Sequence, residues 1–212
     1  MNGGRKPLDV QIPVAESKVT ADSGTMSGPL VAQGARAAAL AQRRADVVHA
    51  ALRFLCLTTS VVSLSAMAVA EQSSSIVIYG FSLPVYAKWS FSDSFEYLVG
   101  MCAAVAAHSL LQLLLSASRM AKRSPVIPSR SHAWLMFAGD QAFAYAMMSA
   151  GSASAGVTNL NRTGIRHAPL PDFCKPLNVF CSRAAVSIAF AFFTCFLLAG
   201  SALLDVIWLS KY

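Results

Sequence analysis

Four apolar runs, each long enough to cross a lipid bilayer, constrain this chain more than any other feature. They cover approximately residues 47–70, 97–118, 133–157 and 184–209. A hydrocarbon core of ~30 Å needs roughly 20 helical residues at ~1.5 Å each. The runs lack both strand-turn punctuation by Pro and Gly and the polar/apolar alternation of β-barrel strands. We therefore predict an all-α fold, a bundle of four transmembrane helices.

The composition agrees with a membrane protein, because 55% of the residues are hydrophobic and only 13% are charged. Residues 1–46 differ, with scattered Gly, Pro and Ser, and predict a disordered tail ahead of a membrane domain over 47–212. The alternative for the first run is a signal peptide, since "AMAVA" ending at Ala70 resembles a cleavage site. We favour a signal anchor that is not cleaved, because the first run is long, contains Arg53 and follows a long tail.

Basic residues near the run ends predict the orientation. Arg43 and Arg44 precede the first run, and a basic cluster occupies the link between the second and third runs: Arg119, Lys122, Arg123 and Arg130. The positive-inside rule places both groups, and therefore both termini, in the cytoplasm, although basic residues in the third link weaken the bias. The net charge of +7 then indicates anionic membrane lipid as a partner, rather than nucleic acid.

Two opposite charges interrupt the apolar runs at similar depth. Arg53 in the first run and Asp140 in the third both lie roughly 10 Å below the predicted cytoplasmic boundary. Because an unpaired charge at that depth costs at least ~2.5–3.5 kcal/mol, we predict an intramembrane Arg53–Asp140 pair. Alternatively, Arg53 snorkels to the lipid head groups while Asp140 pairs with Gln141 or water. Asp205 is a competing partner whose shallower position predicts contact with solvent.

These two segments and the two predicted outer segments carry a resemblance to a known family. The segments are "LRFLCLTTSVVSLSAM" with Arg53, "FAGDQAFAYAMMSAG" with Asp140, "YGFSLPVYAKWSFSDSFEYLVG" and "FCKPLNVFCSRAAVSIAF". In these segments and in helix order, the chain resembles the Casparian strip membrane protein family and its CASP-like relatives. These are plant proteins distantly similar to the MARVEL domain. The resemblance covers roughly residue 47 to the C-terminus.

The resemblance implies a multi-pass plasma-membrane scaffold rather than an enzyme. Such a protein self-associates into membrane domains, forms homo-oligomers and hetero-oligomers with related family members, and gathers machinery that modifies the cell wall. The residues leave two other functions open. A small transporter or channel would use Arg53, Asp140 and His108, with Gln112 one helical turn from His108. An adaptor would act through the tail.

Small residues at four-residue spacing suit close helix packing, either within one subunit or between subunits. They form one stripe in the third run and another in the fourth: Ala138, Ala142, Ala146, Ala150, Ser154, and Ser187, Ala191, Cys195, Ala199.

The predicted outer link between the third and fourth runs carries two candidate modifications. Cys174 and Cys181 lie close together in an oxidising compartment, which predicts a disulfide. "NRT" at Asn161 is a sequon for N-glycosylation. The cysteines have no companion His/Cys set for zinc, and phosphate loops and catalytic triads are not recognisable in the sequence. We therefore predict no metal, no cofactor and no catalytic residue.

Overall fold

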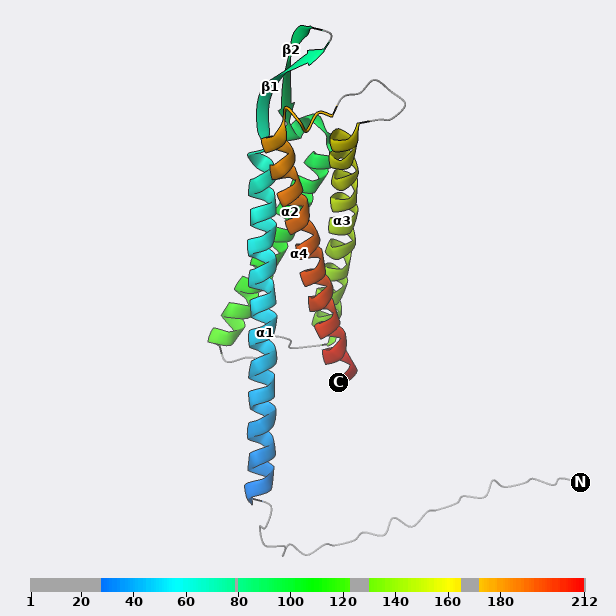
Figure 1. Cartoon of the computed structure of the whole chain (residues 1–212). Coiled ribbons are helices and arrows are strands. Elements are labelled where there is room, and N and C mark those ends of the chain that lie inside the picture. The colour runs from blue at the N-terminus through cyan, green and yellow to red at the C-terminus, as the bar shows by residue number, and fades with distance from the viewer. Residues whose placement is uncertain (1–27, 79, 123–129, 165–171, 212) are drawn as a thin grey trace, which may run out of the picture. The chain divides into compact units, whose positions relative to one another are not determined.

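The computed structural model describes residues 28–78, 80–122, 130–164 and 172–211. The chain divides into two units, residues 1–40 and 41–212. In chain order the elements are α1 (Gly28–Ala68), β1 (Glu71–Ile78), β2 (Phe81–Lys88), the short 3-10 helix η1 (Trp89–Phe91), α2 (Asp93–Ala121), α3 (Arg130–Thr163) and α4 (Asn178–Lys211). In the second unit the helices lie side by side, and the β1–β2 hairpin occupies the end where α4 begins (Figure 1).

The helices extend beyond the predicted apolar runs at both ends, except that α1 ends at Ala68. Helix α1 begins at Gly28, so residues 28–46, which we expected to be disordered, are helical. The apolar runs show only which residues could lie in the hydrocarbon core of a bilayer. A helix can continue beyond that core through polar residues, which are favourable near helix ends. Asp93 and Glu96, for example, lie in the first turn of α2, where negative charge favours the helix dipole.

Three helices are long and apolar enough to cross a membrane: Arg43–Ala68, Asp93–Ala121 and Asn178–Ile207. Among the described residues α3 does not meet this criterion, although the run 133–157 within it was expected to span. Asp140, Gln141 and numerous Ser and Gly residues make α3 more polar than its neighbours. Within the residues it describes, the structure therefore establishes a mostly helical protein with three helices that are both long and apolar enough to cross a membrane.

The hairpin corrects the all-α prediction. Its antiparallel register runs from Glu71 opposite Lys88 to Ile78 opposite Phe81. Two residues connect the strands, and the second, Gly80, has φ 87°, which glycine adopts without steric cost. Pro84 is tolerated because both strands of a two-stranded sheet are edge strands. The sequence offered only a weak signal, since the serines of "EQSSSIVI" obscure any alternation.

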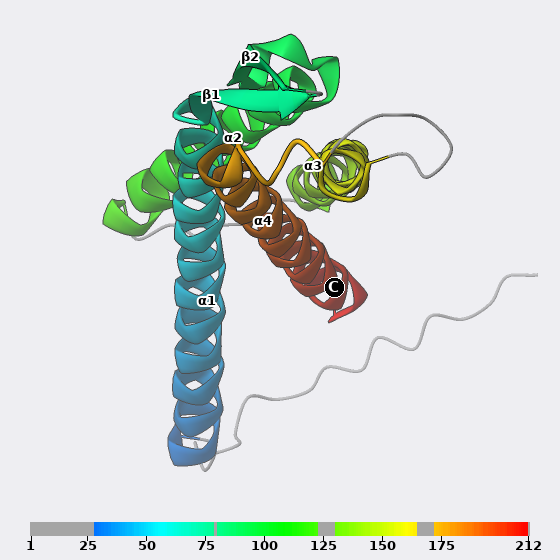
Figure 2. The same ribbon diagram turned by 45° about the horizontal axis from the view of Figure 1, so that its top comes forward.

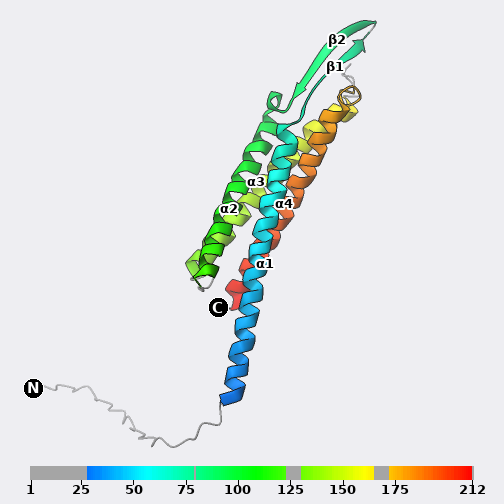
Figure 3. The ribbon, with the colours of Figure 1, turned by 90° about the vertical axis from the view of Figure 1, so that its left-hand side faces the viewer.

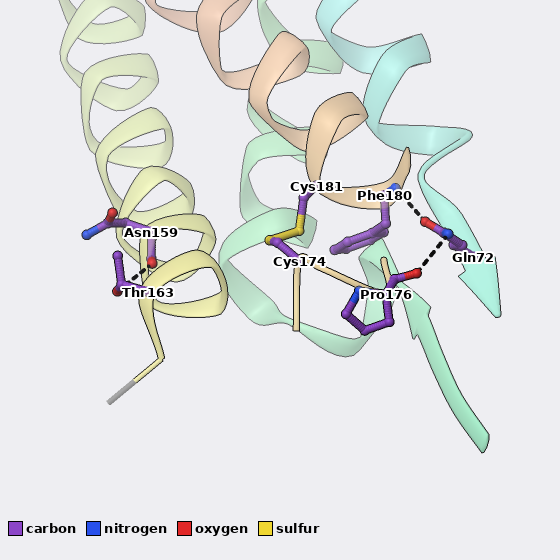
Figure 4. Close-up of a disulfide and its surroundings, with 7 residues drawn as sticks. All are labelled: Gln72, Asn159, Thr163, Cys174, Pro176, Phe180 and Cys181. Carbon is purple, nitrogen blue, oxygen red and sulfur yellow. Dashed lines mark hydrogen bonds between the residues drawn. A yellow bond between two sulfur atoms is a disulfide. The ribbon is translucent and has the colours of Figure 1, made fainter. Parts of the chain in front are cut away.

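One side chain joins the hairpin to the start of α4. The Gln72 amide donates to the Pro176 carbonyl at 3.3 Å, and its carbonyl oxygen accepts from the Phe180 N–H at 2.9 Å (Figure 4). The rest of the hairpin projects beyond the helix ends (Figure 3). Across the strands the Tyr86 hydroxyl donates to Glu71, and this hydrogen bond raises the pKa of Tyr86 above its usual value.

Helices α1 and α4 meet along a seam of small polar residues. The hydroxyls of Ser63 and Ser187 each donate to the other residue's carbonyl at 2.8 Å, and the Thr59 and Thr194 hydroxyls lie 2.8 Å apart. Such short side chains allow close backbone approach. The two helices lie closest near the hairpin and separate towards the opposite end (Figures 1 and 2). Larger side chains therefore bridge them at that opposite end.

We predict that Gln72→Ala loosens the hairpin without unfolding the bundle. The change removes both bonds to the start of α4 and leaves the Phe180 N–H without its acceptor, at a cost of ~1–3 kcal/mol. Hydrogen exchange measured by mass spectrometry should show faster exchange across β1 and β2, and unchanged exchange in α2 and α3. Ser73→Ala, at the exposed neighbouring position, is the matched control. Equal exchange in all three proteins would show that Gln72 does not hold the hairpin.

Candidate functional site

The centre of the bundle holds a buried ion pair between α1 and α3. Arg53 donates from Nη1 to Oδ1 and from Nη2 to Oδ2 of Asp140, both at 2.5 Å. Both side chains are completely buried. This forked geometry uses the planar guanidinium in a way that a lysine ammonium does not. The structure thus brings together the two charges that the sequence placed at matched depth, and neither snorkelling nor a Gln141 contact is needed.

The other two helices complete the coordination of Asp140. Ser201 of α4 donates to Oδ2 at 2.5 Å, and His108 Nε2 of α2 lies 3.2 Å from Oδ1. All four helices therefore meet at one carboxylate. Ser201 was missed in the sequence, because one serine in an apolar run carries no signal of its partner.

His108 contacts two groups through a single ring nitrogen. The Gln112 amide lies 2.7 Å from the same Nε2 that faces Asp140, as their spacing on one face of α2 predicted. One nitrogen cannot donate to Asp140 and accept from Gln112 together, so the ring serves one partner at a time. Gly139 leaves room for the ring, since a Cβ there would lie 3.2 Å from the His108 side chain, which is a tight contact.

A second polar pair lies one helical turn from the first. His49 precedes Arg53 by four residues on α1, and Asp205 follows Ser201 by four residues on α4. His49 Nε2 lies 3.1 Å from Asp205 Oδ1, and Asp205 is fully buried. The predicted solvent contact of Asp205 was wrong, because α1 extends past this level and covers it with His49.

The small-residue stripe of α4 packs inside the bundle. Ser187, Ala191 and Cys195 are buried, and the Cys195 thiol lies 3.3 Å from the Ala144 carbonyl of α3. The α3 stripe divides differently. Ala138 and Ala142 are exposed, whereas Ala150 and Ser154 are buried. A step of four residues advances ~40° beyond a full turn, so the stripe winds from the outer face of α3 to the inner one.

At the hairpin end a disulfide joins Cys174 to Cys181, with Cα atoms 5.8 Å apart (Figure 4). Asn161, the candidate N-glycosylation residue, is half-buried in the last turn of α3, and its carbonyl accepts from the Cys174 N–H at 3.3 Å. The Thr163 hydroxyl of the sequon donates to the Asn159 carbonyl at 3.0 Å. The sequon is therefore helical in the folded chain, and its modification stays a prediction.

The central network consists of hydrogen bonds and one ion pair between helices. Its two charged side chains, Arg53 and Asp140, pair with each other. Within the described residues, three or more His, Cys, Asp or Glu side chains do not gather at one place as metal ligands.

Comparison with known proteins extends this description. Residues 42–197 match the Casparian strip membrane protein domain, which is most of the chain. The protein belongs to the Casparian strip membrane protein family. The match includes Arg53, His108 and Asp140 and ends at Leu197, before Ser201 and Asp205. The resemblance recognised in the sequence is thereby confirmed.

Several plant members of the family are similar over their full length. CASP-like protein 3A1 of Vitis vinifera is 67% identical over 212 residues, which cover all of both chains. CASP-like protein 3A1 of Ricinus communis is 63% identical over 210 residues, covering 99% of this chain and 98% of the relative. CASP-like protein 3A1 of Picea sitchensis is 58% identical over 199 residues, covering 90% and 97%. No solved structure matches the chain.

We predict strong coupling between Arg53 and Asp140. Arg53→Leu and Asp140→Leu should each destabilise the bundle severely, because each leaves the other charge unpaired, at ~3–5 kcal/mol in soluble interiors and less where lipid allows snorkelling. The double substitution should recover much of this loss, with a coupling energy of about 1–3 kcal/mol. Denaturant titration of all four proteins in micelles measures the cycle.

Phe54→Leu, at an exposed neighbouring position, is the control and should change stability little. If the two single losses simply add, Arg53 and Asp140 act independently, and Ser201 and His108 alone satisfy the carboxylate.

Proposed function

We propose that the protein is a multi-pass plasma-membrane scaffold that self-associates into membrane domains. It also forms hetero-oligomers with related family members and organises machinery that modifies the cell wall. Membership of the family supports this proposal, and one structural observation carries the self-association. That observation is the composition of the exposed face of α3.

Small and polar residues are frequent along the middle of the exposed face of α3. Ala142, Ser149, Ser152, Ala153 and Gly156 lie there with two large side chains, Tyr145 and Met148, while the exposed large residues Trp134, Leu135 and Leu160 lie towards the helix ends. The exposed face of α4 instead carries bulky apolar side chains suited to lipid: Phe193, Phe196, Leu203 and Ile207. Helices in membranes associate where small residues let backbones approach and where hydroxyls bond across the interface. We infer that this face of α3 contacts another copy of the chain.

This reading requires α3 to cross the bilayer as a fourth span, although its composition alone is marginal. Contacts support the crossing. Asp140 in the first third of α3 bonds to Arg53, and Ser154 in the last third donates to the Ser94 carbonyl at the start of α2 at 2.9 Å. Helix α2 ends, and α3 begins, at the end of the bundle opposite the hairpin, whereas α4 begins beside the hairpin (Figure 1). If α1, α2 and α4 each cross the membrane, α3 has to carry the chain back across it. Contact with a second copy would cover its polar outer face.

Self-association through α3 should be sensitive to side-chain size. Ala142→Leu with Ala153→Leu keeps the helix apolar but blocks close approach, and should weaken association by about tenfold, or ~1.4 kcal/mol. Energy transfer between two differently labelled copies in liposomes measures this. Ala189→Leu, the same change at an exposed position of α4, should leave energy transfer unchanged. Undiminished transfer in the α3 variant would remove α3 from the interface.

The proposed orientation places the hairpin outside the cell and both termini in the cytoplasm. Cysteines introduced at Lys88 and Lys175 should react with an impermeant reagent added outside intact cells, whereas a cysteine at Lys122 should react only after permeabilisation. The native free cysteines, Cys56, Cys102 and Cys195, are buried and give low background. Labelling of Lys122→Cys in intact cells would show that the orientation is the opposite of the proposed one.

The transporter or channel alternative has no support from the family or from this geometry. Arg53 and His108 both contact the Asp140 carboxylate inside the bundle, as side chains that hold helices together do.

A further inference from the structure

A cavity of about 290 Å³ lies at the base of the hairpin. The end of β2, the starts of α2 and α4, and the last turns of α3 all contribute to its wall. The two outer segments quoted in the sequence analysis, distant along the chain, therefore meet around one space. We call it the hairpin-base cavity.

Two aromatic pairs line the cavity. Tyr86 and Phe91 are exposed and meet edge to face with ring centroids 5.7 Å apart. Phe95 and Phe180 are buried, with ring centroids 6.0 Å apart. The first pair forms a rim and the second a floor. Both surfaces suit a flat apolar body, since aromatic rings prefer edge-to-face or offset contact with another ring.

The disulfide supports one wall of the cavity. Cys174 follows Phe173, a further lining residue, and Cys181 follows Phe180. The covalent bond thus holds the backbone beside two lining rings. A wall ordered before binding loses less entropy when a ligand enters.

The polar lining restricts the chemistry of a ligand. Lys88 is the one ionisable side chain in the cavity wall other than Tyr86, whose hydroxyl is bound to Glu71. Within the described residues Lys88 forms no ion pair. A lysine at an aromatic cavity repels the cations that ring cages otherwise attract, and favours an anion. Besides Lys88 and the Tyr86 hydroxyl, the polar side chains in the cavity wall are Ser92 and Asn161, which are few for binding a sugar.

We propose that the hairpin-base cavity binds a single-ring aromatic acid. The ring lies between the rim and floor pairs, and the carboxylate faces the Lys88 ammonium. The volume is at the small end of the ~300–1,000 Å³ range of ligand pockets, which suits one ring with a short side chain. This site does not depend on self-association, because one copy of the chain supplies every lining residue.

Trp89, next to Lys88, provides a reporter. The full chain with Trp134→Phe and Trp208→Phe, in nanodiscs, leaves Trp89 as the single tryptophan. Titration with benzoate should change its emission saturably. Benzyl alcohol, which keeps the ring, and cyclohexanecarboxylate, which keeps the charge, should both bind at least tenfold more weakly. Choline, a probe for a cation site, should produce no response.

Matched variants locate the binding. Lys88→Gln should weaken benzoate about tenfold or more and affect benzyl alcohol little, since it removes only the charge contact. Phe91→Ala should weaken both ligands several-fold. Lys175→Gln and Phe81→Ala change the same residue types at positions that are 82% and 76% exposed and outside the cavity. Both controls should bind benzoate as the parent protein does.

Four outcomes would overturn the proposal, provided circular dichroism shows folded protein. They are the absence of a saturable response to benzoate, equal binding of cyclohexanecarboxylate, tighter binding of choline, and an equal loss in Lys175→Gln and Lys88→Gln. The last would assign the effect to general surface charge. None of these outcomes bears on energy transfer between copies, so the scaffold proposal is tested separately.

Discussion

The Asp140 carboxylate governs the arrangement of the bundle, because a charge buried in a low-dielectric interior needs an opposite charge and hydrogen-bond donors around it. Arg53 supplies the countercharge, and Ser201 and His108 supply further bonds. These three residues come from three different helices. Satisfying one carboxylate therefore sets the depth and rotation of all four helices at once. Apolar packing alone would tolerate many alternative rotations, since lipid tails and leucine side chains differ little in polarity.

The α1–α4 seam extends this control along the bundle. Serine and threonine pairs hold the helices close near the hairpin, and longer side chains bridge the wider gap at the opposite end. The order of side-chain sizes thus matches the separation of the helices. At the hairpin end Gln72 and the disulfide order the start of α4, which in turn shapes the wall of the hairpin-base cavity.

Polar residues in this protein therefore serve two different surfaces. Those around the Asp140 carboxylate and along the α1–α4 seam form bonds between helices and specify one arrangement of the helices. Those on the exposed face of α3 are the residues that we propose contact a second copy of the chain, because small side chains allow helices to approach closely. Both features suit the proposed scaffold, because a rigid subunit presents the same face to every neighbour. Membership of the Casparian strip membrane protein family is consistent with this division.

The position of a residue along its helix axis could be predicted from the sequence, because each helical residue advances a known distance along the axis. This is why Arg53 and Asp140 could be matched, and why close cysteines in one link predicted the Cys174–Cys181 bond. The segments around them were also enough to recognise the family. The rotation of each helix about its own axis, which decides the residues that face inward, could not be predicted. The same spacing placed Ala142 outside and Ala150 inside, and only packing decided the difference.

The tertiary structure alone decided which weakly marked residues became partners. Ser201 and His49 look ordinary in the sequence, but neighbouring helices place them beside Asp140 and Asp205. The hairpin likewise depends on Gln72 reaching α4, a contact between residues 108 positions apart. The sequence by itself thus determined the apolar part of each helix, the matching level of Arg53 and Asp140, and the need for a buried pair. The choice of neighbours required the folded chain, because a polar group's partner depends on which helices meet around it.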